Sequence, residues 1–312
     1  MKTKTTKVVK SCQKNSTTLS QAAVLQIARS RIEQFLPLKA DGYACTTEQL
    51  VDVLLAVCCQ KETLEQVCSD LKIKVGAETL RGYFNQQLQV GNLSGLQEAV
   101  HLALQASLQA ELKEQKLDVA IDFHDQSYYG KSAPSEGQWV GAEAKNGTTK
   151  VSWVATLYVI KNGHWLTLAI KFVLPGETAK ESVEYLLNQM KSLEIAAKCL
   201  YLDRGFGGIE IARYLKETGQ KAIIACPIRG KTGGLRGWLC VGRKNYRTKH
   251  LFQSAKHGAE EVAMVLFKAF TTSTKKGQKV RQVKWLALYV GQLRREFECQ
   301  ESERKLPQKV WH

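Results

Sequence analysis

The chain lacks the long hydrophobic segment that a membrane helix requires. Its longest apolar runs, at 151–160 and 165–174, fall short of the roughly 18–20 residues needed to cross a bilayer, and a polar turn at 161–163 separates them. The first eighteen residues are rich in Lys, Thr and Ser and contain no apolar core of a signal peptide. We therefore expect no membrane partner and a cytoplasmic location.

Cysteine pairs of the kind that bind zinc or form disulfide frameworks are also absent. The nine cysteines show no C-x-x-C spacing and no pairing with histidine at zinc-finger spacing. Several lie inside apolar runs, among them Cys58, Cys59 and Cys226, which is typical of reduced, buried thiols. The segment LDRGFGG at 202–208 lacks the spacing and the lysine of a phosphate-binding loop, so it predicts no nucleotide cofactor.

Acidic residues are scarce toward the end of the chain. The 312 residues hold 45 Lys and Arg against 29 Asp and Glu, a net charge of +16. Residues 228–312 alone carry 19 basic and 6 acidic side chains, a net charge of +13. Charge concentrated in this way favours a surface that binds a polyanion, and we interpret it as a nucleic-acid surface rather than a solvated face.

The N-terminal third predicts helices that follow a flexible basic arm at 1–18. We interpret residues 19–115 as a helical DNA-binding region. Within it, 63–71 and 77–88 are two helices joined by a tight turn, the outline of a helix-turn-helix. Arg81 on the second of these helices is expected to contact DNA. A plain helical bundle is the alternative interpretation.

From residue 116 the pattern changes to short apolar runs alternating with amphipathic helices. An Asn-Gly pair at 162–163 predicts a hairpin between two of the runs. The order of elements predicts an α/β fold over 116–227, a ribonuclease-H-like mixed sheet with helices on both faces. The predicted strands lie at 117–123, 151–160, 164–174, 198–203 and 221–226, and the predicted helices at 177–193 and 208–218.

The remaining residues divide into a basic β-rich insertion at 228–288 and a C-terminal helix of the core at 289–312. From Arg229 to Lys284 there are 14 Lys and Arg residues but only two acidic residues, Glu260 and Glu261. Strands are predicted in the insertion at 235–242, 246–252, 261–270 and 282–290.

Two aspartates, Asp122 and Asp203, end predicted buried strands. Adjacent strands that end on the same side of a sheet would bring these carboxylates within a few Å of each other, where they repel. A divalent cation removes the repulsion, and hard oxygen ligands suit Mg²⁺ or Mn²⁺. Two such ions can clamp the attacking and leaving oxygens of a phosphodiester. For either aspartate alone, a turn or helix-cap residue is the simpler interpretation.

The segments AIDFHDQSYYG at 120–130 and LYLDRGFGG at 200–208 resemble those of DDE transposases of bacterial and archaeal insertion sequences. The resemblance covers roughly residues 45–298 and is to the subgroup with a β-strand insertion before the third acidic residue. It implies that Asp122 and Asp203 are the first two catalytic metal ligands. It also implies two bound Mg²⁺ (or Mn²⁺) ions.

Members of this subgroup carry a Tyr, Arg, Glu and Lys signature on a late helix, and its Glu is the third ligand. Arg294, Glu298 and Lys305 match the last three members of the spacing, whereas Gly291 stands where the family has Tyr. The resemblance therefore implies Glu298 as the third catalytic carboxylate. Neighbouring glutamates at 296, 301 and 303 are the alternatives.

A transposase of this kind cleaves DNA strands at the ends of an insertion sequence and transfers the freed 3′-hydroxyl to target DNA. The implied partners are double-stranded DNA, as terminal inverted repeats and target, and a second copy of the chain in a synaptic complex. A nucleoid-associated location follows. The DNA contacts expected outside the N-terminal region come from Arg294, Lys305, Arg236, Arg243, Lys244, Arg247 and Lys249.

Two other functions fit the same residues. The first alternative is a catalytically defective, truncated or frame-shifted transposase copy that only binds DNA. The second is a ribonuclease-H-fold DNA nuclease such as a resolvase. Metal-dependent nicking of a duplex separates an enzyme from the first alternative. Strand transfer separates a transposase from the second.

Overall fold

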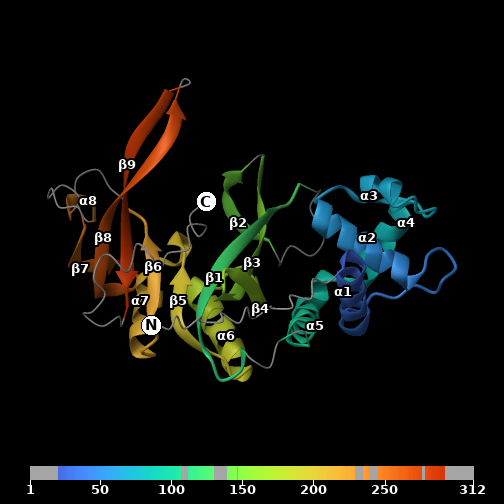
Figure 1. Cartoon of the computed structure of the whole chain (residues 1–312), viewed down its shortest axis with the longest axis horizontal. Helices are drawn as coiled ribbons and strands as arrows, with labels where there is room; N and C mark the ends of the chain where they lie inside the picture. Colours follow the sequence, from blue (N-terminus) through green and yellow to red (C-terminus); the bar gives the residue numbers. More distant parts are fainter. Residues whose placement is uncertain are drawn as a thin grey trace, which may run out of the picture. The chain divides into compact units, whose positions relative to one another are not determined.

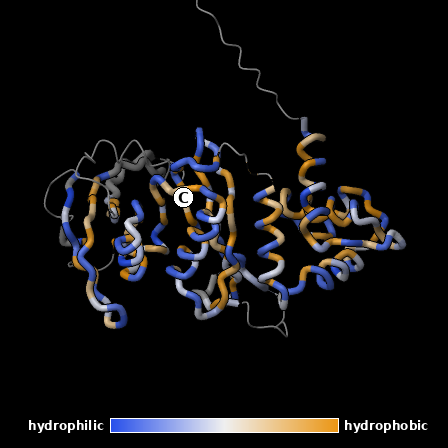
Figure 2. Tube along the Cα trace, turned by 90° about the horizontal axis from the view of Figure 1, so that it is seen from below, coloured by the Kyte–Doolittle hydropathy of each residue, from blue (hydrophilic) through white to orange (hydrophobic). Residues whose placement is uncertain are grey.

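The computed structural model describes residues 20–106, 108, 112–129, 139–145, 147–228, 235–238, 245–275 and 278–291. The chain divides into two compact units, Met1–Leu88 and Gln89–His312, whose elements are labelled in Figure 1. Hydrophobic segments (orange in Figure 2) and hydrophilic ones (blue) run through both units. Within the described ranges, no helix combines the length and the apolar character needed to span a bilayer.

The first unit is helical, as the sequence predicts. Three of its helices begin at a hydroxyl side chain that accepts a backbone N–H bond of 3.2 Å from the residue three positions on, namely Ser20, Thr46 and Thr63. Its core contains Leu38, Leu50, Val53, Val67 and Leu80. The described helices are α1 (Gln21–Phe35), α2 (Thr47–Gln60), α3 (Leu64–Asp70) and α4 (Ala77–Gln87).

The second unit contains one nine-stranded sheet and the helices around it. Its strands are β1 (Lys116–Ser127), β2 (Val140–Lys145), β3 (Thr148–Lys161), β4 (His164–Val173), β5 (Ala196–Leu202), β6 (Ala222–Cys226), β7 (Asn245–Ser254), β8 (Gly258–Lys275) and β9 (Gln278–Val290). Its helices are η1 (Val90–Asn92), α5 (Leu93–Gln105), α6 (Ala179–Ser192), η4 (Arg204–Phe206), α7 (Ile209–Glu217) and α8 (Leu235–Trp238).

The strand order of the sheet is β2-β3-β1-β5-β6-β9-β8-β7, and β4 also pairs with β3. The three central strands β1, β5 and β6 are parallel, and the other pairings are antiparallel. An antiparallel hairpin beside parallel strands joined by helices is the mixed α/β, ribonuclease-H-like arrangement that the sequence predicts.

The hairpin between β3 and β4 forms at the predicted turn. Asn162 and Gly163 both have positive φ, 52° and 79°, between the paired residues Lys161 and His164. A two-residue hairpin turn with positive φ at both positions matches the right-handed twist of the strands, which is why Asn-Gly is favoured there.

The sheet is buried on both faces, because successive residues of its strands belong to two different hydrophobic clusters. Val119 and Ile121 of β1 join the larger cluster, to which α6 and α7 also contribute, whereas Ala120 joins the smaller one. In the described part of the chain, strand residues alone make up the smaller cluster. The C-terminal helix predicted at 289–312 lies largely outside the described residues, and Tyr289 and Val290 are the last residues of β9.

The strands of the predicted insertion extend this same sheet, because β9 pairs with β6 along Ala287–Val290. The strand predicted at 235–242 is wrong over 235–238, because Leu235–Trp238 forms the short helix α8, and residues 239–242 lie outside the described ranges. Tryptophan and valine are enriched in strands, but this preference depends on packing and burial, so tertiary context decides the outcome in a segment as short as Leu235–Trp238.

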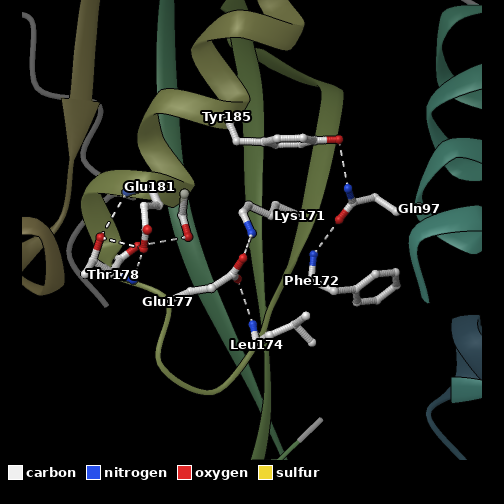
Figure 3. A network of polar contacts seen from close by, with 9 residues as sticks. Gln97, Lys171, Phe172, Leu174, Glu177, Thr178, Glu181 and Tyr185 are labelled. Atoms are coloured by element: carbon white, nitrogen blue, oxygen red, sulfur yellow. Dashed lines mark hydrogen bonds and ion pairs between the residues drawn. The ribbon is translucent and has the colours of Figure 1, made fainter. Parts of the chain in front are cut away.

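Helix α5 packs on β4, which lies at an edge of the sheet (Figures 1 and 3). Gln97 accepts a 2.8 Å bond from the backbone N–H of Phe172 and donates one of 2.8 Å to the hydroxyl of Tyr185 on α6. One turn later, Nε2 of His101 lies 2.8 Å from the carbonyl oxygen of Ile170. Side chains of α5 therefore satisfy backbone groups that a neighbouring strand would otherwise pair.

A second set of polar contacts in Figure 3 fixes the start of α6. Lys171 forms a 2.6 Å ion pair with Glu177, which also accepts the N–H of Leu174 at 2.8 Å. Thr178 and Glu181 then form a capping box in which each side chain bonds the other's backbone N–H. These contacts hold the loop between β4 and α6.

We expect Gln97→Ala to lower the free energy of unfolding by about 1–3 kcal/mol, because it removes two hydrogen bonds and leaves the N–H of Phe172 without its partner. Urea unfolding of the full chain measures the change. Glu98→Ala is the control, since Glu98 is exposed on the same helix. An equal loss in both variants would mean that the bonds of Gln97 add nothing.

Candidate metal centre at the ends of two parallel strands

Asp122 and Asp203 occupy neighbouring positions on adjacent parallel strands. The last parallel pair of β1 and β5 is Ile121 with Leu202, and each aspartate is the next residue of its chain segment. Neighbouring strands lie about 4.8 Å apart, so the two backbones are in direct lateral contact there. Both aspartates are partly buried. β1 continues past Asp122 to Ser127, so the first aspartate lies within a longer strand than predicted.

The two carboxylates face the same side of the sheet. Asp122 shares its face of β1 with Ala120, and the extended backbone of Asp203 (φ −78°, ψ −172°) continues the face of Tyr201. Tyr158 of β3 pairs with Ala120 on this face. Burial raises the pKa of Tyr158, and the negative charges of both aspartates raise it further. The hydroxyl of Tyr158 is therefore close enough to both carboxylates for their charges to affect its pKa.

Asp203 is held in a local environment that disfavours its charge. Burial raises its pKa above the usual value, and the negative charge of Asp122 adds to this effect. The backbone N–H of Gly205, which donates a 2.8 Å bond to Oδ1 of Asp203, acts in the opposite direction. The net result is a carboxylate that a cation would stabilise.

Two stacked phenylalanines lie directly behind the aspartates, on the opposite face of the sheet. Phe123 follows Asp122 in β1, and Phe206 belongs to the turn η4 after Asp203. Their rings are parallel within 7°, with centroids 4.4 Å apart. Phe206 is fully buried, and Trp153 packs edge-on against Phe123 at 5.8 Å. The stack therefore joins the two segments that carry the aspartates.

Tyr158 is a site residue that the sequence does not single out. Its hydroxyl lies 3.1 Å from Nε2 of His124, which is exposed on β1 two residues after Asp122. The predicted strand at 151–160 includes Tyr158, but no local signal gives the β1–β3 register that places it beside the aspartates.

Among the described residues, Asp122 and Asp203 provide two ligands for a divalent cation but not a complete coordination shell. Two adjacent carboxylates, both negatively charged, suit a hard cation such as Mg²⁺. Across the described ranges, no group of three or more His, Cys, Asp and Glu side chains is arranged to hold a metal ion. Glu298, the predicted third ligand, lies outside these ranges.

Four predicted DNA contacts are in described parts of the chain. Arg81 pairs with Glu65 and Glu78, so a phosphate would compete with two carboxylates for its guanidinium. Lys249 is exposed and forms a 2.7 Å ion pair with Glu261. Arg236 and Arg247 are also exposed. The other four predicted contacts, Arg243, Lys244, Arg294 and Lys305, lie outside the described residues.

The raised pKa of Asp203 gives a pH prediction for metal-free protein. Because the folded state binds this proton more tightly than the unfolded chain does, stability falls as the pH rises from below the unfolded pKa through the folded one. Asn at position 203 keeps an acceptor for the N–H of Gly205 and carries no charge. We therefore expect Asp203→Asn to be more stable than the wild type at neutral pH.

The difference should vanish at about pH 3, where a carboxyl group is protonated in both states. Urea unfolding in the presence of a chelator at the two pH values measures it. A variant that is less stable than the wild type at neutral pH would contradict the electrostatic origin of the shift.

Comparison with known proteins gives remote similarities only. No protein-family model and no curated protein matches the chain. It is similar to the cryo-EM structure of a piggyBac transposase synaptic complex with hairpin DNA, with 9% identity and a TM-score of 0.44 over 84% of this chain and 57% of that chain.

Two further transposase structures are similar at lower TM-scores. The Mos1 transposase paired-end complex with left transposon end has 12% identity and a TM-score of 0.22 over 55% of this chain and 57% of that one. The Drosophila P element transposase strand transfer complex has 12% identity and a TM-score of 0.28 over 64% and 43%. The chain therefore spans between 43% and 57% of the length of these three structures.

Proposed function

We propose that this protein is a transposase that cleaves DNA strands with divalent metal ions and transfers them to target DNA. One observation supports the proposal above all others: Asp122 and Asp203 follow the last paired residues of two adjacent parallel strands and face the same side of the sheet. Such a pair suits phosphodiester chemistry, which depends on positioning and on neutralising charge.

In this proposal the carboxylate oxygens of Asp122 and Asp203 hold the cation. When bound, a divalent cation polarises the phosphodiester and stabilises the negative charge of the attacking oxygen. The protein orients its ligands through backbone groups, since the N–H of Phe123 donates to Oδ1 of Asp122 at 2.9 Å and that of Gly205 donates to Oδ1 of Asp203 at 2.8 Å. Tyr158 is protonated at neutral pH, as an ordinary tyrosine is, and burial together with the negative charges of Asp122 and Asp203 raises its pKa further.

Duplex DNA is the proposed substrate because of the charge of the chain. The net charge of +13 is confined to residues 228–312, which include the strands β7, β8 and β9 of the catalytic sheet. Positive charge in this unit would attract phosphates toward the central strands β1 and β5, where the aspartates lie.

The test is nicking of supercoiled plasmid by the full chain with Mg²⁺, with Mn²⁺, and with a chelator. We expect nicks only with a divalent cation, and joining of a DNA end with a free 3′-hydroxyl to a second duplex. DNA binding without nicking would favour the DNA-binding alternative. Nicking without any strand transfer would favour a ribonuclease-H-fold nuclease instead.

A further inference from the structure

The strands β8 and β9 continue as a two-stranded ribbon beyond the rest of the sheet (Figure 1). Strand β7 pairs with β8 only up to Phe267, and β6 pairs with β9 only from Ala287. From the pair Lys268–Trp285 to the pair Lys275–Gln278, the two strands are paired with each other and with no other described strand. We call these residues the β8–β9 ribbon. Eight residues in each strand give it a length of about 25 Å.

Described side chains define the base of the β8–β9 ribbon. The side-chain oxygen of Asn245, the first residue of β7, accepts a 3.1 Å bond from the backbone N–H of Lys268. This bond ends the three-stranded part of the sheet. The Nζ of Lys268 lies 5.8 Å from the ring centroid of Trp285, its partner across the ribbon. The ribbon is thus fixed at its base to the catalytic sheet.

The two strands of the ribbon carry charge of one sign only. They contain five Lys and Arg residues and no Asp or Glu, and no acidic residue occurs between Glu261 and Glu296. Four consecutive hydroxyl residues, Thr271–Thr274, belong to the ribbon part of β8. A solvated surface ribbon would ordinarily mix both signs of charge. The basic residues of the ribbon are Lys268, Lys275, Lys279, Arg281 and Lys284.

We propose that the β8–β9 ribbon binds duplex DNA by lying in the major groove. The two strands of a ribbon are about 4.8 Å apart, and the major groove of B-form DNA, about 12 Å wide, accepts a two-stranded ribbon. Phosphates flank the groove and attract basic residues, and base edges on its floor form hydrogen bonds with hydroxyl and amide residues, which are the residue types that the ribbon sequence supplies. The ribbon length corresponds to about seven base pairs at 3.4 Å each.

The ribbon favours DNA over double-stranded RNA, because the major groove of an A-form helix is too narrow for it. This inference goes beyond the proposed chemistry, since it requires no metal and neither Asp122 nor Asp203. A different role for the lysines is to keep the bare edges of the ribbon from pairing with another chain. The experiment separates the two roles.

The test compares two variants with the same change in charge. In the ribbon variant Lys275, Lys279, Arg281 and Lys284 become glutamine. In the control variant four exposed lysines near the opposite ends of the parallel strands become glutamine, namely Lys116, Lys191, Lys198 and Lys221. Affinity for a duplex of about 40 base pairs is measured by fluorescence anisotropy over a range of salt concentrations, with a chelator present to prevent cleavage.

We expect the ribbon variant to bind at least roughly 100-fold more weakly at 0.1 M salt, and the slope of log affinity against log salt to become shallower by about 3 to 4. The control variant should keep its slope within about 1 of the wild type. Thermal unfolding shows whether both variants are folded. Equal losses in the two variants, or a ribbon variant that only self-associates while DNA affinity is unchanged, would overturn the proposal.

A duplex whose cytosines carry a glucosylated 5-hydroxymethyl group tests the groove, because the sugar fills the major groove. We expect the wild type to lose most of its affinity on this duplex and the ribbon variant to lose almost none. Wild-type affinity that is the same for modified DNA, unmodified DNA and an RNA duplex would exclude the major groove. These outcomes are independent of nicking, so they remain interpretable if the proposed transposase activity fails.

Discussion

Replacing either Asp122 or Asp203 by asparagine is expected to lower the rate of Mg²⁺-dependent nicking by about 10³-fold or more. Asparagine keeps the size and one oxygen acceptor of the side chain, so the bonds from Phe123 and Gly205 are preserved while the negative charge is lost. Removing one preorganised group from a charge-stabilising site costs about 10²–10³ in rate, and loss of a metal ligand costs at least as much.

The double variant should be little worse than either single one, because two ligands of one site act as a unit. Asp118→Asn is the matched control. Asp118 lies on the same strand and the same face of β1, at the end away from Asp203, and should retain wild-type nicking. Adding Mg²⁺ should raise the unfolding temperature of the wild type and of this control but not that of the double variant.

Nicking at wild-type rates by Asp122→Asn would rule out the proposed site, because the remaining carboxylate cannot hold the cation in the same way. Affinity for DNA in a chelating buffer should be unchanged or slightly higher in these variants, since each loses a negative charge near the DNA. A loss of DNA affinity equal to the loss of nicking would show that binding, and not chemistry, is affected.

Replacing Phe206, which lies behind the two aspartates, by alanine should lower the free energy of unfolding more than the other substitutions proposed here. Phe206 is fully buried and stacks on Phe123 at 4.4 Å, so Phe206→Ala leaves a cavity in the larger hydrophobic cluster. Replacing a buried phenylalanine by alanine costs about 3–5 kcal/mol. Urea unfolding of the full chain measures this value.

Phe206→Leu fills more of the cavity and should lose clearly less stability than Phe206→Ala. Tyr129→Ala, at an aromatic residue that is 63% exposed, should change stability by less than about 0.5 kcal/mol.

The leucine variant also tests whether the stack of Phe123 and Phe206 positions the aspartates. Since the stack joins the segments after Asp122 and Asp203, a loosened stack should also slow nicking at temperatures where the variant is fully folded. A leucine variant with wild-type stability and wild-type nicking would mean that the stack does not position the aspartates.

Features that depend on neighbouring residues could be predicted from the sequence. The Asn162-Gly163 turn fixes the β3–β4 hairpin because both positions need positive φ. The helix predicted at 177–193 forms as α6, and it begins after Thr178 because the hydroxyl of Thr178 bonds the N–H group three residues away. Short apolar runs likewise predicted the parallel strands β1, β5 and β6, although the predicted and observed strand ends differ by a few residues.

Features that depend on register and on distant segments required the tertiary structure. Only the pairing of β1 with β5 shows that Asp122 and Asp203 are neighbours, and only the pairing of β1 with β3 brings Tyr158 to the same face. The sequence separates the two aspartates by eighty residues, and no local pattern specifies which pairs of strands will meet. The role of Glu298 stays a prediction.

By itself, then, the amino-acid sequence determined most of the helices and strands, the basic character of residues 228–312 and the residue types available for metal binding. The tertiary structure decided that β7, β8 and β9 extend the sheet that carries Asp122 and that β8 and β9 continue beyond it as a ribbon. The physical reason is that turns and caps are set by bonds within a few residues, whereas strand pairing depends on long-range burial, which many registers of the same apolar runs could satisfy.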